Sequence, residues 1–329
     1  MVTSLARRSV LRHLGALATA ATVPGLSFAQ SSGVPLRIVV GFPPGGATDT
    51  VARILVERLR EALGGQTIIV DNKAGAGGQI AAQALKTAAP DGHTLMLSID
   101  HTQVIVPLTM NTAGYDAVQD FTPVAGVAQY FNALAVNSSI GVRSVSELAA
   151  WLKANPSQQN YGIPAPGSVP QFAGFILGKS MGLPLNPIPY KGGAPLIADL
   201  LGAQVPMGFA SLTELIEHHR SGKLRVLATT GTQRSKTAPD IPTFQELGLK
   251  GLDKNPWLGF FGPRGLPPAT VERFNAAVRK ALGDADVREK LAKLGNEAMP
   301  STAAELGHWV ADAHAHWSGV IRESGFTPG

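Results

Sequence analysis

A glycine-rich loop, Phe42–Asp49, carries the clearest chemistry in the sequence. It follows a short apolar run, Leu36–Val40, and precedes an apolar pattern of helical spacing, so it is expected to join a strand to a helix. Glycines let backbone N–H groups converge, and a helix N-terminus adds about half a positive charge. This arrangement predicts an anion site that needs no cationic side chain, with these candidate residues: Gly45, Gly46, Ala47, Thr48 and Asp49.

Asp49 has a second interpretation, because its carboxylate can cap the helix by accepting from N–H groups two or three residues further on. A nucleotide site is disfavoured, since a phosphate-binding P-loop needs a lysine and Gly46-Ala47-Thr48 has none. A second loop, Gly75–Ile80, begins like a dinucleotide motif but has Ile80 where the third glycine belongs. With nucleotide binding disfavoured, the two glycine loops are best explained as a ligand site, because open α/β sheets bind ligands at the carboxyl ends of adjacent strands. Gly77 and Gly78 are the candidate residues from the second loop.

Further candidates follow other strands. Ser98 ends the third expected strand, and His101 lies just beyond it, within reach of a cleft. In the second half of the chain, a strand leads through Pro- and Gly-rich residues into a helix, with Ile163, Gly167 and Ser168 along the way. Ser168 is either a helix cap or a ligand donor. Tyr190 and Lys191 follow another strand and offer a hydroxyl and an ammonium group beside a flexible turn.

The sequence shows no strong pattern of catalytic or metal-binding residues. The chain has no cysteine, which excludes thiol nucleophiles, cysteine-based zinc sites and iron–sulfur clusters, and it lacks Gly-x-Ser-x-Gly. His308, Asp312 and His316 share one helix face at a spacing that can hold zinc, but a third firm ligand is not evident, so a solvated helix face is favoured. The sequence predicts no metal, no cofactor and no enzymatic activity.

Strand and helix patterns alternate along the chain, which predicts α/β structure with parallel sheets covered on both faces. Strands are expected at 36–40, 67–70, 94–98, 133–136, 160–163, 188–190, 205–209, 224–228 and 257–261. Helices are expected at 49–63, from the second glycine loop to 86, and at 145–154, 169–181, 194–201, 268–282, 286–294 and 302–324. Residues 231–256 are rich in proline, glycine and charge, which indicates a connection.

The N-terminus is expected to be an export signal. Arg7, Arg8 and Arg12 precede an Ala-rich apolar stretch that Pro24 interrupts, and Leu26–Ala29 offers small residues for cleavage. Residues 1–29 are therefore predicted to be a signal peptide, for either the twin-arginine or the general route, and the mature protein is placed in the periplasm. Removal of the three arginines lowers the formal charge from +5 to +2.

The rest of the composition narrows the class of protein. No later stretch reaches the ~18 consecutive apolar residues that a membrane span needs. No run of five or more lysines and arginines is present, so a nucleic-acid partner is not supported. About 300 residues can bury a large core without disulfides, and this length suggests two domains.

Several motifs, taken in order, resemble the Bug (TctC) family of extracytoplasmic receptors of tripartite tricarboxylate transport. The match runs from about Pro35 to the C-terminus, and the motifs that carry it are Pro44–Asp49, Asn72–Gly78, Ala89–Leu95, Asp120–Pro123 and Pro189–Pro195. The resemblance implies a type II periplasmic-binding-protein fold, in which two lobes enclose a cleft. We expect one lobe to comprise 33–132 and 253–329, and the other 133–252.

The same resemblance implies that backbone amides and water hold a carboxylate in the cleft, chiefly on the first glycine loop. By motif position, Gly46, Ala47, Thr48 and Asp49 carry over, with Gly77 and Gly78 as weaker candidates. One departure is Ile163, because the family often has serine there, and Pro164–Pro166 are unusual. We therefore expect a less polar far half of the pocket and a ligand with an apolar or aromatic body.

The function expected from the sequence is a monomeric periplasmic receptor. It would bind a small carboxylate and deliver it to the permease subunits of an inner-membrane tripartite transporter. Two alternatives stay open: a ligand sensor that feeds a signalling kinase, and a periplasmic enzyme that acts on a carboxylic acid through Asp49, Asp100 or His101.

Overall fold

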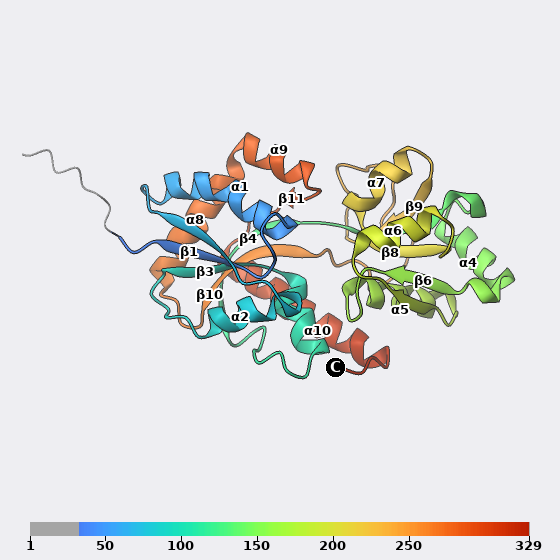
Figure 1. The fold of residues 1–329 in the computed structure, drawn as a ribbon, viewed down its shortest axis with the longest axis horizontal. Helices are drawn as coiled ribbons and strands as arrows, with labels where there is room; N and C mark the ends of the chain where they lie inside the picture. The colour runs from blue at the N-terminus through green and yellow to red at the C-terminus, as the bar shows by residue number, and fades with distance from the viewer. Residues whose placement is uncertain (1–32, 329) are drawn as a thin grey trace, which may run out of the picture. The chain divides into compact units, whose positions relative to one another are not determined.

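The computed structural model describes residues 33–328, which form two mixed β-sheets with helices on both faces (Figure 1). The predicted signal peptide, 1–29, lies outside these residues. The first sheet has the order β11-β4-β10-β3-β1-β2, with β1 at Leu36–Val40, β2 at Ile68–Asn72, β3 at Thr94–Ile99, β4 at Phe121–Gln129, β10 at Trp257–Pro263 and β11 at Glu297–Ala298. The second has the order β7-β6-β8-β5-β9, with β5 at Asn132–Asn137, β6 at Asn160–Ile163, β7 at Asn186–Pro189, β8 at Met207–Ser211 and β9 at Leu224–Thr229.

The expectation of parallel sheets holds for only part of each sheet. β1 runs parallel to β2 and β3, but β10 runs antiparallel to both β3 and β4. In the second sheet, β6 is parallel to β7 and β8, whereas β5 is antiparallel to β8 and β9. A strand that is buried on both faces has a continuous apolar sequence whichever way it runs, so the pattern alone carries no information on direction.

Helices cover both faces of the first sheet, and this sheet with its helices is called the first lobe below. One face packs against α1 (Ala47–Ala62), α8 (Pro268–Gly283) and α9 (Ala285–Lys293). The other packs against α2 (Gln79–Lys86), a π-helical turn at His101–Ile105, α3 (Val106–Thr109) and α10 (Ala303–Glu323). Among residues 33–328, no helix has the length and apolar character needed to cross a membrane.

The second sheet and its helices form the second lobe. Its two faces pack against α4 (Val145–Ala154) with α5 (Val169–Met181), and against α6 (Gly193–Leu201) with α7 (Leu212–Arg220). Short 3-10 turns occur in this lobe at Ser138–Ile140 and Pro156–Gln158, and in the first lobe at Ala76–Gly78. The helix α4 begins where Ser144 accepts a hydrogen bond from the N–H of Glu147, and α5 ends at Gly182, whose φ of 65° only glycine adopts freely.

Two chain segments run between the lobes and are hydrogen-bonded to each other. Tyr130 and Phe131 join β4 to β5, and residues 230–256 join β9 to β10. The N–H of Tyr130 donates to the carbonyl of Pro256 at 3.0 Å, and Asn255 accepts from the Thr230 hydroxyl at 2.9 Å. The lobes also meet where α10 packs against α5, with the rings of Trp317 and Phe172 6.3 Å apart.

Candidate functional site

A cavity of about 480 Å³ is lined by residues of both lobes and includes part of the first glycine loop. The first lobe contributes the ends of β3, β4 and β10 and the turn between α9 and β11, and the second lobe contributes the turn from β8 into α7. The lining residues are Phe42, Pro43, Gly46, Ala47, Thr48, Ile99, Tyr130, Ser211, Thr213, Glu214, Leu258, Leu294 and Asn296.

The N-terminus of α1 supplies backbone donors to this cavity. Gly46 is the N-cap, and its own N–H donates to the carbonyl of Pro43 at 3.1 Å. The next three N–H groups, from Ala47 to Asp49, precede the first intrahelical bond, which Thr50 makes to Gly46. Within residues 33–328, no side chain caps them. The positive end of α1 therefore faces the cavity with donors available to an anion.

Asp49 supports this loop from behind and does not act as the N-cap. The helix begins at Ala47, two residues before the expected start, so Asp49 lies in the first turn. Its carboxylate is 1 % exposed and accepts from the Gly45 N–H at 2.8 Å and the Asn72 amide at 2.9 Å. Arg53 pairs with it at 2.9 Å, and the hydrogen bond from Arg53 is the main reason that the pKa of Asp49 falls to about 2.

The walls of the cavity are largely apolar. Seven of the lining side chains are hydrocarbon or aromatic: Phe42, Pro43, Ala47, Ile99, Tyr130, Leu258 and Leu294. The Tyr130 hydroxyl donates to Asp100 at 3.4 Å, and burial raises the pKa of Tyr130 well above its ordinary value. Such walls favour the hydrocarbon body of a ligand over water, while the α1 amides fix its charged end.

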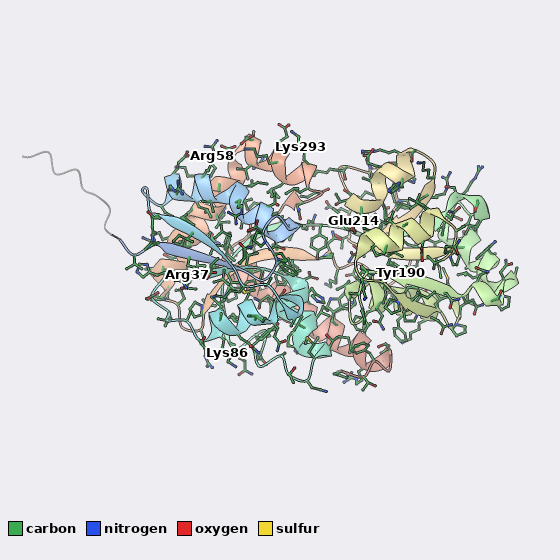
Figure 2. All side chains as sticks on the ribbon, viewed as in Figure 1. Arg37, Arg58, Lys86, Tyr190, Glu214 and Lys293 are labelled. Atoms are coloured by element: carbon green, nitrogen blue, oxygen red, sulfur yellow. The ribbon has the colours of Figure 1, made fainter. Side chains whose placement is uncertain are left out.

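The far side of the cavity carries polar groups that the sequence analysis did not select. Ser211, Thr213 and Glu214 come from the start of α7, and Asn296 comes from the turn before β11. Figure 2 labels Glu214 in the second lobe, where the side chain extends from α7. Ser211 ends a strand, and Thr213 and Glu214 follow it directly, so the rule that selected the first glycine loop could also have selected them. Asn296 follows a helix and carries no such signal.

The second glycine loop lies outside the lining of this cavity and packs against the π-helical turn instead. A Cβ on Gly78 would lie 2.5 Å from the hydroxyl of Thr102, and one on Gly77 would lie 3.1 Å from His101 Nε2. Thr102 donates to the carbonyl of Gly77 at 2.7 Å. Both glycines also have positive φ, so close packing and backbone conformation account for them without a ligand.

Ser98 and His101 also lie outside the cavity lining. Ser98 is 1 % exposed, and within the described residues its buried hydroxyl has no hydrogen-bond partner. His101 opens the π-helical turn, and burial lowers its pKa to about 4, so the imidazole is neutral near pH 7.

The second-lobe candidates are likewise placed away from the cavity. Ile163 is 1 % exposed and belongs to the core under α4 and α5, so the argument that its missing hydroxyl shapes the pocket loses its basis. Gly167 donates to Gln171 at 2.7 Å. Ser168 is the N-cap of α5 by position, but its hydroxyl donates backwards to the carbonyl of Ala165 at 2.6 Å.

Tyr190 and Lys191 follow β7 and do not line the cavity. The Tyr190 hydroxyl donates to Asp199 at 2.8 Å, and burial raises its pKa to about 12 (Figure 2). Lys191 is exposed. Their motif therefore positions the start of α6, whereas the cavity itself takes its second-lobe residues from α7.

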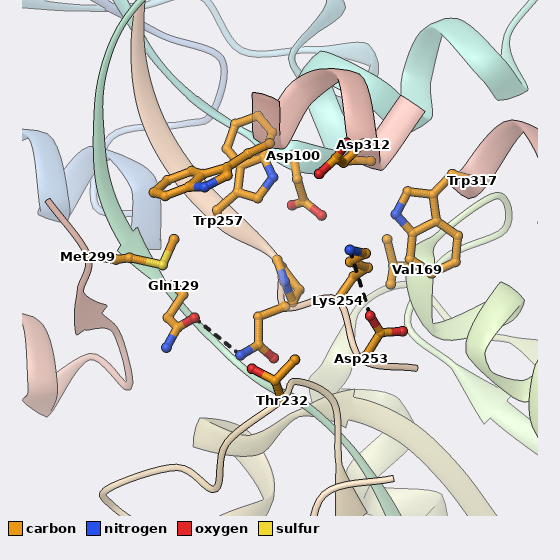
Figure 3. A pocket seen from close by; sticks show the side chains of 14 residues that line it. Asp100, Gln129, Val169, Thr232, Asp253, Lys254, Trp257, Met299, Asp312 and Trp317 are labelled. Atoms are coloured by element: carbon orange, nitrogen blue, oxygen red, sulfur yellow. Dashed lines mark hydrogen bonds and ion pairs between the residues drawn. The ribbon is translucent and has the colours of Figure 1, made fainter. Parts of the chain in front are cut away.

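A smaller pocket of about 170 Å³ is lined by residues next to the same ends of β3, β4 and β10 (Figure 3). Asp100, Gln129 and Trp257 line it, whereas their chain neighbours Ile99, Tyr130 and Leu258 line the larger cavity. This alternation is typical of strands. Burial raises the pKa of Asp100 to about 7. Among residues 33–328, no group of three or more His, Cys, Asp or Glu is placed to hold a metal ion.

Comparison with known proteins gives the family. The sequence model described as "Tripartite tricarboxylate transporter family receptor" matches residues 51–326. The chain belongs to this family. The resemblance drawn from the sequence motifs is thereby confirmed, and the fold is that of the periplasmic binding proteins of this family.

Individual relatives cover nearly the whole chain. Protein BugT of Bordetella pertussis is 34% identical over 310 residues, which span 94% of this chain and 95% of that protein. The structure of MatC (Rpa3494) from Rhodopseudomonas palustris with bound malate is similar with a TM-score of 0.71 and 31% identity, covering 87% of this chain and 98% of that one. The structure of R. palustris Rpa4515 with adipate has a TM-score of 0.75 and 31% identity, covering 88% and 97%.

Proposed function

We propose that this receptor works in the periplasm, where it binds a small carboxylate in the 480 Å³ cavity and delivers it to the permease subunits of a tripartite transporter. The observation that carries the proposal is the N-terminus of α1, whose uncapped N–H groups face a largely apolar cavity bounded by both lobes. A ligand that contacts both lobes favours the arrangement that brings them together, because only differential affinity shifts a conformational equilibrium.

The side chains around the cavity support ligand binding and not catalysis. The Asp49 carboxylate is fully engaged with Arg53, Asn72 and the Gly45 N–H, so it is not available as a general base. Asp100 has a raised pKa, but it lines the smaller pocket. The relatives with bound malate and adipate are consistent with a carboxylate ligand. Turnover of a bound acid by the purified protein would contradict this part of the proposal.

The first experiment is a thermal-shift screen of aliphatic and aromatic mono- and dicarboxylates, followed by calorimetry on those that shift the melting temperature. A ligand at about 100 times its Kd stabilises the folded state by about 2.7 kcal/mol. We expect at least one carboxylate to bind at micromolar Kd or tighter, and a protein that binds none of them would contradict the proposed function.

The second experiment removes one donor and keeps the helix. Ala47 is the first helical residue, and Gly46 before it has φ −69° and ψ 164°, a conformation that a following proline accepts. Ala47→Pro replaces one N–H by a methylene group, and we expect the carboxylate affinity to fall about tenfold or more. The matched control is Ala285→Pro at the first position of α9, where Asp284 has a similar conformation. Unchanged affinity in a folded Ala47→Pro protein would exclude α1 from the site.

A further inference from the structure

Glu214 gives the cavity a chemically distinct far end. It is the one Asp, Glu, His, Lys or Arg residue of the described cavity lining, because the other lining residues are apolar, aromatic, hydroxyl or amide residues. No lysine or arginine lines the cavity to neutralise it. The α1 end of the cavity is therefore electropositive, whereas the α7 end carries a carboxylate.

The position of this carboxylate is set by the backbone of the second lobe. The Glu214 carboxylate lies against Gly193, the first residue of α6, so closely that a Cβ on Gly193 would collide with it. Within the described residues no side chain caps α6, and the Glu214 carboxylate lies next to the first residue of this helix. A protein carboxylate thus lies at the second-lobe helix N-terminus, where a ligand's second carboxylate would otherwise be favoured.

The carboxylate also stays accessible from the cavity. The residue as a whole is exposed, and partial desolvation raises the pKa of Glu214. A second ligand carboxylate at this end would meet a like charge in a partly apolar surrounding, which costs more there than in water. An ammonium group or another hydrogen-bond donor would gain a charge-assisted hydrogen bond instead.

We infer that Glu214 selects the far end of the ligand, so that the cavity takes a carboxylate that carries a hydrogen-bond donor, an aminocarboxylate, in preference to a dicarboxylate of the same length. The inference rests on the proposed function, because the α1 amides must hold the ligand's carboxylate for Glu214 to face its other end. It assigns Glu214 as a specificity residue and α1 as the common anchor.

The test uses pairs of acids that differ only at one end. These are succinate with 4-aminobutanoate, adipate with 6-aminohexanoate, and terephthalate with 4-(aminomethyl)benzoate, with hexanoate as the singly charged reference. In each pair that binds, calorimetry at neutral pH is expected to show the amino member at least about tenfold tighter. In Glu214→Gln that preference is expected to disappear, through weaker binding of the amino member and tighter binding of the diacid, with hexanoate little changed.

The control is Glu217→Gln, which removes the same charge from the same helix outside the cavity lining. Glu217 pairs with Arg220 at 2.6 Å on the surface, and this variant is expected to keep the wild-type preference.

Diacids that bind as tightly as their amino partners would overturn the inference and leave the proposed function intact, as would an unchanged preference in Glu214→Gln. An equal loss of affinity for every acid in Glu214→Gln would show that Glu214 only holds α6 and α7 in place. If no amino member binds while other carboxylates of the screen do, the inference is overturned and the proposed function stands; if no carboxylate of the screen binds, the proposed function itself is contradicted.

Discussion

At the scale of single residues, the anion site depends on how the charge of Asp49 is neutralised. A carboxylate in the first turn of α1 would oppose a ligand anion at the same helix end. Arg53, one turn further along, pairs with Asp49 and leaves the local charge near zero. The Asp49 carboxylate can therefore hold the loop through Gly45 and Asn72 without repelling the ligand.

Arg53→Met is expected to weaken carboxylate binding about three- to tenfold, because it leaves the Asp49 charge uncompensated beside the α1 amides. The pKa of Asp49 should rise at the same time, since the hydrogen bond from Arg53 is the main cause of its low value. Calorimetry with the tightest acid of the screen measures the first effect, and NMR titration of the carboxyl resonance measures the second.

Arg60→Met is the matched control, because it removes the same charge from the last turn of the same helix. Equal losses of affinity in the two variants would show that the net charge of the protein, and not the Asp49–Arg53 pair, governs binding.

Asp100 predicts a pH dependence of stability. Its pKa is raised to about 7 because it is buried, whereas an unfolded chain has an Asp pKa of 3.8. Between these values the folded state holds a proton that the unfolded state has lost, so the contribution of Asp100 to the free energy of unfolding should fall as the pH rises from about 4 to about 7. His101 acts in the opposite direction, because burial lowers its pKa to about 4. The Asp100 contribution is therefore the difference between wild type and Asp100→Asn, and we expect this difference to fall by about 2 to 4 kcal/mol. Urea unfolding at pH 5 and pH 8 measures it, with Asp253→Asn from the same pocket as the control. A difference between wild type and Asp100→Asn that does not change with pH would contradict the assignment.

At the scale of elements, sequence periodicity succeeded where helix ends are marked by side chains. The bounds of α4 and α5 were predicted correctly, because Ser144 caps one helix and Gly182 ends the other. β4 was missed, since Pro123 and Gly126 interrupt its apolar pattern. The α7 residues of the cavity were missed for another reason: the strand before them was expected to end at 209, two residues before β8 ends, and no helix was expected after it.

Gly126 occupies its place in β4 because a helix packs directly on it. A Cβ there would lie 2.5 Å from the ring of Trp309 on α10 and 2.7 Å from the hydroxyl of Ser301. Gly126→Ala is therefore expected to lower the free energy of unfolding by about 1 to 3 kcal/mol through overpacking. Gly319→Ala, in the interior of α10, meets no atom within 4 Å and should raise it by about 0.5 to 1 kcal/mol. Urea denaturation of the two variants compares them, and a neutral Gly126→Ala would refute the packing argument.

At the scale of the whole molecule, residue patterns predicted the class of fold, whereas the division into lobes came only from the family resemblance. The division into 33–132 with 253–329 and 133–252 remains a proposal. The contacts that bear on it are long-range: Asn255 bonds to Thr230 at 2.9 Å and to Gln129 at 3.3 Å, and Gly231 approaches Asn255 so closely that a Cβ would lie 2.5 Å from its amide. Local periodicity carries no information on such pairings.

Asn255, which lines the smaller pocket, therefore connects the segment 230–256 to the end of β4 through Gln129, and connects the two ends of that segment through Thr230. Without this tie the lobes should sample more arrangements, and the arrangement that binds ligand should be a smaller fraction of the population. We expect Asn255→Ala to weaken carboxylate binding about three- to tenfold. The loss should appear mainly as faster dissociation, because the segments that hold the lobes around the ligand are freer to separate.

Asn275→Ala separates this effect from a general loss of hydrogen bonds. Asn275 donates to the carbonyls of Val124 and Ser301 at 2.8 Å each, and all three residues belong to the first lobe. Both variants should cost about 1 kcal/mol or more in the free energy of unfolding, because each leaves hydrogen-bonding groups unpaired. Only Asn255→Ala should change the dissociation rate measured by stopped-flow fluorescence of the tryptophans. Equal dissociation rates in the two variants would mean that the crossing segments do not control how the lobes hold the ligand, and that affinity is set by the α1 amides and the cavity walls alone.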